Sequence, residues 1–488
     1  MLPTYYLSID LGATSGRTMI AKYDGRCISM HELTRFQTIQ IHRDGHVFWD
    51  LPNLYNEVLQ ALQKVKAEGI ELTSIGIDTW GCDVAFFSEE GKLMGLPFCY
   101  RDPHTDGAME RFFSESMSRE ELYKRTGIQF MPFNTLFQLD TILGARGKEQ
   151  KDSTLRGGLV GSILFMPDAL IYMLTGEAVC ERTVASTSQM VNPRTGDFDE
   201  TILEKLGLKR EQFGRLVSPG ERVGVLSLDV QERTGLGAVP VVAVGSHDTA
   251  SAVAAVPAED GNYAYLSCGT WSLLGIESPT PIINEESLRH NFTNEGGLDG
   301  TIRFLKNITG LWLLEGCRKE WTAPFQASYQ GERLSVPSDV NELNALCLAS
   351  SCQSLINPDD PRFAHPESMT AAICDYLKET GQELPQKPAD YVRIIFRSLA
   401  ARYAEVVDVL RAIAPVDIQR LHVIGGGSKN EFLMQFTADA LHLPVIAGPQ
   451  EGTALGNALV QVRASGFVNS LAEMRAIIGR SVELKTYR

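Results

Sequence analysis

SIDLGATSGRTMIAKYD, residues 8–24, is the stretch that decides how the rest of this chain is interpreted. An apolar strand ends at Asp10, a turn of small residues follows at 12–16, and Arg17 opens a second apolar strand. Small residues let main-chain N–H groups approach a phosphate, and the turn's hydroxyls add donors. Asp10 can hold a hydrated Mg²⁺ there, and Arg17 can neutralise phosphate charge. The alternative, from this stretch alone, is an ordinary hairpin with a glycine turn.

Length and composition limit the possible classes of protein. A chain of 488 residues is expected to form two or three domains, and its 44% hydrophobic content suits a large buried core. The net charge of −15 argues against nucleic acid or an anionic membrane as the main partner. The 9 cysteines form no CxxC pair or regular framework, which favours reduced thiols.

Targeting signals are not evident in the sequence. The N-terminus lacks a basic region followed by an apolar core, so no signal peptide is expected. No apolar run approaches the ~18 residues of a membrane span. These observations predict a soluble cytoplasmic protein.

The first 90 residues predict an antiparallel meander followed by a helix and a further strand. Asp50 is the expected N-cap of that helix, and apolar residues recur on one of its faces. The strands are expected at 5–10, 17–23, 27–36 and 74–78, with the helix ending near Lys66. This order of elements is that of a ribonuclease-H-like domain.

The second half of the chain repeats this idea loosely. A strand, turn and helix are expected at 239–256, a strand–turn–strand at 262–278, and a strand, triple glycine and helix at 421–441. A long amphipathic helix precedes the last of these and spans at least 392–410. The duplication predicts an α/β fold of two ribonuclease-H-like domains flanking a cleft, with domains at 1–245 and 246–488.

Three turns rich in Gly, Ser and Thr follow strands, at 12–16, 268–270 and 425–427. Together they are similar to the two phosphate hairpins and the adenosine loop of the sugar kinase/Hsp70/actin ATPases. A dinucleotide-binding fold is the alternative for the triple glycine. It would require a glycine at position 430, which is Asn430, and an acidic partner downstream.

Ser246-His247-Asp248 spells the residues of a hydrolase triad, but a triad is assembled from distant segments of a chain. Asp248 follows a buried strand and precedes a helix. Its carboxylate can therefore accept a proton from a substrate hydroxyl, as a catalytic-loop aspartate does in phosphoryl transfer. From the local sequence, a role as the cap of the helix begun by Thr249 is equally consistent.

The chain resembles the FGGY carbohydrate kinases over almost its full length, and within them the members that act on L-rhamnulose. The resembling segments, in family order, are SIDLGATSGR (8–17), SIGIDTWGCD (74–83), GLPFCYRD (95–102), GIQFMPFNTLFQL (127–139), MPDALIYMLTGE (166–177), GSHDTASAV (245–253), LSCGTWSLLG (266–275), FTNEGG (292–297), LKNITGLWLL (305–314) and HVIGGGSKN (422–430). The HDTAS run within them distinguishes best among family members.

The resemblance implies ATP-dependent, Mg²⁺-assisted phosphorylation of a primary hydroxyl of a ketose, L-rhamnulose, with Asp248 as proton acceptor. The first domain would carry the sugar and phosphate side and the second the adenosine side. The residues implied for ATP are Ala13, Thr14, Ser15, Gly16, Arg17, Thr270, Glu315 and Gly426, and those for the ketose are Gly81, His247, Asp248, Thr249 and Asn307. Asp10 would contact the metal through water.

Three positions leave questions open. Relatives tend to carry glutamine where this chain has Glu315, and a carboxylate there would repel a phosphate. Cys82 occupies a position at which relatives tend to carry valine. Trp80 is equally consistent with a place near the sugar or in the core. The alternative functions are another ketose kinase of this family, such as one for L-fuculose, or an assembly ATPase of the actin/Hsp70 type.

Overall fold

The computed structural model describes residues 2–143, 160–322, 345–364 and 366–488. The chain divides into two compact units. The first contains Met1–Glu259, Glu277–Phe304 and Gly452–Ser481, and the second contains Asp260–Ile276, Leu305–Glu451 and Val482–Arg488. The chain thus leaves the first unit and re-enters it twice, and each unit is described in turn.

A mixed sheet forms the centre of the first unit, with strand order β13-β14-β6-β1-β2-β3. Its strands are β1 (Thr4–Leu11), β2 (Ser15–Tyr23), β3 (Ile28–Gln37), β6 (Leu72–Thr79), β13 (Arg222–Val225) and β14 (Pro240–Val242). β1, β2 and β3 form the antiparallel meander, whereas β6 pairs parallel with both β1 and β14. The predicted strands of the first 90 residues are therefore confirmed, each to within two residues at its ends.

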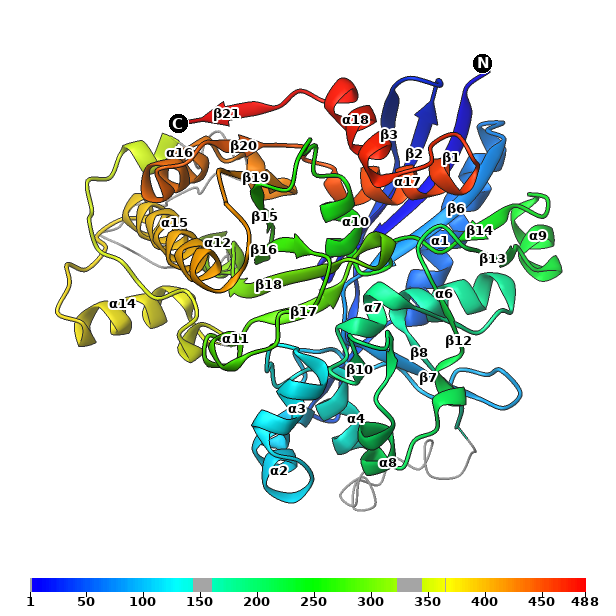
Figure 1. The fold of residues 1–488 in the computed structure, drawn as a ribbon, viewed down its shortest axis with the longest axis horizontal. Helices are drawn as coiled ribbons and strands as arrows, with labels where there is room; N and C mark the ends of the chain where they lie inside the picture. Colours follow the sequence, from blue (N-terminus) through cyan, green and yellow to red (C-terminus); the bar gives the residue numbers. More distant parts are fainter. Residues whose placement is uncertain (1, 144–159, 323–344, 365) are drawn as a thin grey trace. The chain divides into compact units, whose positions relative to one another are not determined.

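Side chains of β1 and β6 alternate between the two faces of this sheet. Leu7, Ile9 and Leu11 join the apolar cluster that contains α1 (Leu51–Ala67) and α6 (Met166–Thr175). Asp50 caps α1 as predicted and accepts a hydrogen bond of 3.0 Å from the N–H of Asn53. The other face is covered by α17 (Gly452–Ala464), which packs beside β1 and β6 and against α10 (Asp248–Ala254) (Figure 1).

A second apolar cluster in the first unit lies around the antiparallel pair of β7 (Val84–Ser88) and β8 (Val160–Phe165). Three further two-stranded pairings are β4 (Gln40–Arg43) with β5 (His46–Trp49), β9 (Val179–Glu181) with β12 (Arg215–Val217), and β10 (Val191–Asn192) with β11 (Asp197–Phe198). The remaining helices and the strand β17 of this unit are α2 (Ala108–Glu115), α3 (Arg119–Thr126), α4 (Thr135–Leu143), α7 (Arg182–Ser186), α8 (Glu200–Leu206), α9 (Leu228–Thr234), α11 (Glu285–Arg289), α18 (Leu471–Ser481) and β17 (Thr293–Gly296).

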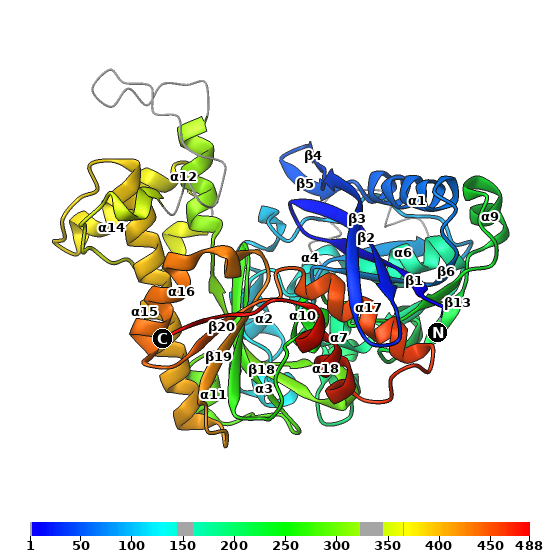
Figure 2. The ribbon, with the colours of Figure 1, turned by 90° about the horizontal axis from the view of Figure 1, so that it is seen from above.

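The second unit repeats the pattern of a hairpin beside parallel strands, in a seven-stranded sheet of order β17-β18-β16-β15-β19-β20-β21 whose first strand, β17, belongs to the first unit. Its strands are β15 (Tyr263–Cys268), β16 (Trp271–Ser278), β18 (Ile302–Thr309), β19 (Arg420–Ile424), β20 (Val445–Ala447) and β21 (Lys485–Tyr487). β15 pairs antiparallel with β16 and parallel with β19. Its helices are α12 (Trp312–Thr322), α14 (Met369–Glu379), α15 (Pro388–Ile413) and α16 (Glu431–Leu441), and Figure 2 shows α15 and α16 beside β19 and β20. The predicted strands and the long helix are confirmed.

Candidate active site

Two carboxylates of the first unit lie at the ends of neighbouring parallel strands. Asp10 of β1 is in register with Asp78 of β6, on the face that α17 covers. β6 continues into a bridge between Thr79 and His247, and the N–H of Thr79 donates to the carbonyl of Ser246 over 2.9 Å. Parallel strands present their carboxyl ends at one edge of a sheet. The ends of β1 and β6 and the residue before Asp248 therefore meet at that edge.

Asp10 forms an ion pair with Arg17, its cross-strand neighbour in the hairpin of β1 and β2. Nε and Nη2 of Arg17 donate to Oδ2 of Asp10 over 2.9 and 2.8 Å. Both side chains are only slightly exposed, at 11% for Asp10 and 18% for Arg17. A positive and a negative group are thus fixed side by side next to the small-residue turn, as recognition of a phosphate and its metal requires.

The turn at 12–16 is held by main-chain hydrogen bonds. The N–H of Gly12 donates to the carbonyl of Ser15 over 3.0 Å, and the hydroxyl of Thr38 donates to the carbonyl of Gly12 over 2.6 Å. Thr14 is exposed, and Ala13 and Ser15 are partly exposed, so their polar groups are accessible to a ligand. Gly16 is different, because a Cβ there would overlap with the ring of Phe36. Close packing against Phe36 therefore explains why position 16 is a glycine.

Asp78 is fully buried and belongs to a polar network with α17. Its Oδ2 accepts a hydrogen bond of 2.6 Å from Asn457, whose Oδ1 accepts one of 2.8 Å from Gln461. Its Oδ1 has no hydrogen-bond partner among the described residues. Burial raises the pKa of Asp78 well above its usual value, and the negative charge of Asp10 adds to that effect. The sequence identified this strand end but assigned no role to the carboxylate.

Asp248 is the first residue of α10, and the N-cap is His247. The Asp248 carboxylate accepts a hydrogen bond of 3.0 Å from the hydroxyl of Thr249 and lies 3.5 Å from Nε2 of His247. The interpretation of Asp248 as the cap of a helix begun by Thr249 is therefore wrong. The side chain is 32% exposed and accessible to a substrate. Burial raises the pKa of Asp248, nearby His247 opposes that rise, and Asp10 adds to it.

Gly81 and Cys82 lie just beyond the end of β6. A Cβ at Gly81 would lie 2.8 Å from Oγ1 of Thr187, and that same hydroxyl oxygen accepts a hydrogen bond of 3.1 Å from the N–H of Cys82. Cys82 has a φ of 72°, a left-handed conformation that non-glycine residues rarely adopt. Trp80 donates to Asp83 over 2.9 Å and packs against Trp49, which places it in the core and answers the question left open by the sequence.

The second unit brings three predicted nucleotide segments together. Main-chain N–H groups of residues 310 and 312 donate to the carbonyl of Thr270, each over 3.2 Å. A Cβ at Gly425 would lie 3.1 Å from the carbonyl oxygen of Cys268, so the glycine loop lies against the end of β15. Gly426, in contrast, has no described atom within 4 Å of an added Cβ. The backbone of Gly426 therefore faces open space.

Glu315 lies in the first turn of α12 in the second unit and forms an ion pair with Arg318. Nη1 of Arg318 lies 2.6 Å from Oε1 of Glu315. The sequence led us to expect that the carboxylate of Glu315 would repel a phosphate of ATP. The positive charge of Arg318 reduces that repulsion. Asn307 lies in β18 and also belongs to the second unit, whereas the other predicted ketose residues belong to the first.

No cluster of three or more His, Cys, Asp or Glu that could hold a metal ion was found among the described residues. The oxygens of Asp10 and Asp78 nevertheless suit Mg²⁺. This ion keeps several waters and needs only one or two carboxylates. The unpartnered Oδ1 of buried Asp78 is the observation that supports this fit.

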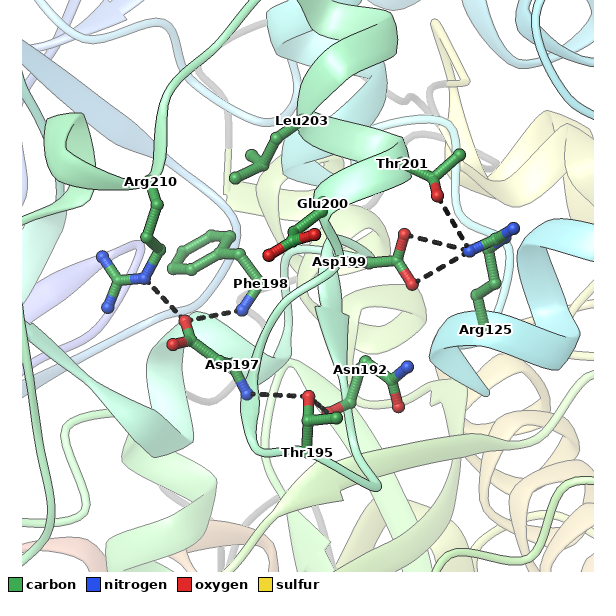
Figure 3. Close-up of a pocket in the computed structure, with 10 residues that line it drawn as sticks. All are labelled: Arg125, Asn192, Thr195, Asp197, Phe198, Asp199, Glu200, Thr201, Leu203 and Arg210. Carbon is green, nitrogen blue, oxygen red and sulfur yellow. Dashed lines mark hydrogen bonds and ion pairs between the residues drawn. The ribbon is translucent and has the colours of Figure 1, made fainter.

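A pocket of about 400 Å³ lies elsewhere in the first unit, beside α8 (Figure 3). None of the residues predicted from the sequence for the active site lines it. Its charged groups face each other: Arg210 pairs with Asp197 at 2.6 Å, and Arg125 with Asp199 at 3.3 Å. The pocket therefore contributes nothing to the candidate active site.

No helix in the described ranges is long and apolar enough to cross a membrane. Solved structures of other kinases share the fold of this chain at low sequence identity. A ligand-bound xylulose kinase from Lactobacillus acidophilus superposes with a TM-score of 0.77 at 15% identity, covering 99% of this chain and 93% of the other. A glycerol kinase from Plasmodium falciparum with ADP gives a TM-score of 0.75 at 16% identity, with the same coverages. These likenesses show the α/β fold of two ribonuclease-H-like domains.

Sequence relatives are much closer. A protein named rhamnulokinase from Bacteroides thetaiotaomicron is 49% identical over 485 residues, covering 99% of this chain and 95% of the relative. Another protein of that name, from Pectobacterium carotovorum, is 41% identical over 487 residues, covering 99% and 92%. Models of the N-terminal and C-terminal domains of the FGGY family of carbohydrate kinases match residues 5–255 and 264–465. The chain therefore belongs to the FGGY family of carbohydrate kinases, which use ATP to phosphorylate a sugar hydroxyl.

Proposed function

We propose that this kinase transfers the γ-phosphoryl group of ATP to the 1-hydroxyl of L-rhamnulose, giving L-rhamnulose 1-phosphate and ADP. The observation that carries the choice of sugar is the 49% identity, over 99% of the chain, to a protein named rhamnulokinase. The local geometry around Asp248 supports the choice of reaction.

Asp248 is proposed as the acceptor of the hydroxyl proton. Its carboxylate is 32% exposed, lies at the N-terminus of α10, and is 3.5 Å from Nε2 of His247. Phosphoryl transfer leaves little covalent chemistry to the protein, so alignment of the hydroxyl and stabilisation of charge dominate. Burial raises the pKa of Asp248, which strengthens its carboxylate as a proton acceptor.

The proposed contacts of ATP come from both units. The phosphates are assigned to the turn of Ala13, Thr14, Ser15 and Gly16, to Arg17, and to Thr270 of the second unit. Gly426 is assigned to the adenosine because its open side accepts a flat ring, and Glu315 stays a nucleotide contact whose charge Arg318 offsets. A bound Mg²⁺ would supply positive charge between the phosphates, with Asp10 as its ligand through water.

The proposed contacts of the ketose are Gly81, His247, Thr249 and Asn307. Gly81 leaves no room for a side chain beside Thr187, which fixes the main chain after β6.

The boundary between sugar and nucleotide domains near residue 245 stays a prediction, as does the cytoplasmic location. The thiols of all nine cysteines are free, as a reducing compartment would keep them.

The test compares ketoses and varies the proposed base. L-Rhamnulose should give the highest kcat/KM in a panel with L-fuculose, D-xylulose, D-ribulose and glycerol. Asp248→Asn keeps the size of the side chain but cannot accept a proton, so kcat should fall by about 10²–10⁴-fold. Asp229→Asn is the control, because that carboxylate is 74% exposed in α9 and should leave kcat unchanged.

Each outcome has a definite meaning. A preference for L-fuculose would make the chain a different ketose kinase of the family, and a preference for glycerol or D-xylulose would contradict the proposed substrate. A kcat within a few-fold of wild type in Asp248→Asn would contradict the role of this residue as the base.

A further inference from the structure

Two buried charged side chains contact the ring of His247 and have no assigned role in the proposed reaction. Arg303, in the part of β18 that belongs to the first unit, has a side chain that is 0% exposed. Glu295 of β17 is 6% exposed, and His247 itself is 10% exposed. A buried arginine is costly unless it is paired, so this arrangement calls for a reason.

The three side chains contact one another directly. Nη2 of Arg303 lies 3.1 Å from Nδ1 of His247 and 3.2 Å from Oε2 of Glu295. Oε2 of Glu295 lies 3.3 Å from the same Nδ1. The guanidinium is fixed further by a hydrogen bond of 2.8 Å from Arg303 Nε to the carbonyl of Gly296. Arg303 is therefore held in one orientation, with Nη2 toward the imidazole.

The contact with Arg303 favours one position for the ring proton of His247. A guanidinium has only donors, so the nitrogen that receives its hydrogen bond must carry a lone pair. Nδ1 of His247 is that nitrogen, and the proton of the neutral ring is then on Nε2. Nε2 lies on the opposite side of the ring, 3.5 Å from Oδ1 of Asp248. The N–H thus faces the proposed base.

The main chain at His247 is fixed separately. The N–H of Ser246 donates to Oε2 of Glu181 over 3.1 Å, and the N–H of His247 donates to Oγ1 of Thr183 over 3.2 Å. The hydroxyl of Thr183 in turn donates to Glu181. Glu181 therefore anchors the backbone, which leaves only the orientation of the ring for Arg303 to determine.

We propose that Arg303 and Glu295 are positioning residues that hold His247 as the neutral tautomer protonated on Nε2, with this N–H presented to Asp248 and the reacting hydroxyl of the ketose. Arg303 supplies the hydrogen bond to Nδ1, and Glu295 balances the buried charge. In this tautomer the facing nitrogen has no lone pair, so His247 cannot compete with Asp248 for the hydroxyl proton. The kinetic effect expected from this inference rests on the proposed function, whereas the tautomer of His247 does not.

The tautomer is tested first by NMR of ¹⁵N-histidine-labelled enzyme without ligands near neutral pH, with His247→Asn used to assign the signal. The wild type should show a protonated Nε2 and an unprotonated Nδ1. In Arg303→Met, Nδ1 faces Glu295 alone and should become the protonated nitrogen. A wild type protonated on Nδ1, or on both nitrogens, would overturn the inference.

The kinetic test uses the same variants with L-rhamnulose and ATP. Arg303→Met should lower kcat/KM for the ketose on the order of 10²-fold, while KM for ATP stays within about two-fold. Arg303→Lys keeps a donor on the same element and should recover part of the loss. Glu295→Met/Arg303→Met removes both buried charges together, so it remains informative if the single variant does not fold; it should show the same loss.

The matched control is Arg125→Met in α3. Arg125 also pairs with a buried carboxylate, since its Nη1 lies 3.3 Å from Oδ1 of Asp199, whose side chain is 6% exposed. This variant should leave the His247 spectrum and the ketose kinetics unchanged. Wild-type ketose kinetics in both Arg303 variants would overturn the inference. A wild-type enzyme inactive on L-rhamnulose would contradict the proposed function instead, and the NMR measurement would still test the tautomer.

Discussion

At the scale of single residues, Asp83 shows how a buried carboxylate organises the segment that follows β6. Its Oδ2 accepts hydrogen bonds from the indoles of Trp49 and Trp80, at 2.5 and 2.9 Å, and its Oδ1 accepts one of 2.8 Å from Gln138. Burial raises the pKa of Asp83 to about 6, and these hydrogen bonds oppose the rise. Three distant segments thus meet on one ionisable group.

This raised pKa predicts a pH dependence with a definite sign. Folded Asp83 keeps its proton to about pH 6, whereas the unfolded chain loses it near pH 3.8. The folded state binds more protons between these values, so the free energy of unfolding falls as the pH rises. Relative to Asp83→Asn, the wild type should lose about 2 kcal/mol from about pH 4 to about pH 7.

The measurement is urea unfolding of wild type and Asp83→Asn at several pH values. The comparison with Asp83→Asn removes contributions shared by the two proteins, including carboxylates whose pKa is lowered. Asp102 is one of these, because His104, Val47 and His46 donate hydrogen bonds to it and lower its pKa to about 2. A difference between the two proteins that stays constant with pH would contradict the prediction.

Gly426 offers a second prediction for a single residue. Since an added side chain there meets no described atom within 4 Å, Gly426→Val should fold normally. The new methyl groups would occupy the space proposed for adenosine, so KM for ATP should rise at least about ten-fold while KM for the ketose changes little. Gly261→Val, also in open space in the second unit, is the control. Equal rises in both KM values would contradict the placement of adenosine at this loop.

At the scale of elements, the contact between α10 and α17 determines where Asp248 lies. A Cβ at Gly456 of α17 would overlap with the main-chain carbonyl of Ser251 in α10. The two helices therefore approach more closely than any other residue would allow. Because α10 begins at Asp248, a displacement of this helix moves the proposed base.

Gly456→Ala should thus reduce both stability and activity. Overpacking of this kind costs about 1–3 kcal/mol, and kcat should fall because Asp248 shifts. Gly479→Ala in α18 is the control: nothing lies within 4 Å of the added methyl group, so stability should rise by about 0.4–1 kcal/mol. Thermal unfolding and ketose kinetics of both variants provide the measurement. A Gly456→Ala enzyme as stable and active as wild type would show that the helix contact is not restrictive.

The sequence predicted elements better than the contacts between them. The β1–β2 hairpin and α1 were predictable because local rules determine them: alternation, a tight turn, the Asp50 cap and one apolar face. The contact of Gly456 with Ser251 was not predictable, because it depends on packing between residues 205 positions apart. The ion pair of Glu315 with Arg318 joins residues three positions apart on one helix, so the sequence alone could have predicted it.

The candidate site divides in the same way. The sequence identified Asp10, Arg17 and Asp248, because each lies in or next to a recognisable strand. It assigned no role to Glu295 and Arg303, whose relation to His247 appears only when β17 and β18 reach it in space. It also left the helix-cap role of Asp248 open, which one hydrogen bond and one helix boundary resolve.

At the scale of the whole molecule, residues proposed for one reaction are divided between two units. Arg17 and Asp248 belong to the first, whereas Thr270 and Gly426 belong to the second. Each unit has its own sheet, and the chain passes between the units repeatedly. Binding of both substrates is therefore expected to be needed before the groups act together.

This division predicts that ATP is consumed slowly unless the ketose is present. Water is small and makes few contacts, so it supplies little of the binding energy that assembles such a site. ADP release should increase on the order of 10²-fold or more when L-rhamnulose is added to enzyme and ATP, as measured in a coupled assay. Asp248→Asn should abolish most of the increase and leave the slow basal rate unchanged, because that rate does not depend on deprotonation of a sugar hydroxyl. Rapid hydrolysis that the ketose does not accelerate would favour an ATPase of the assembly type over a sugar kinase.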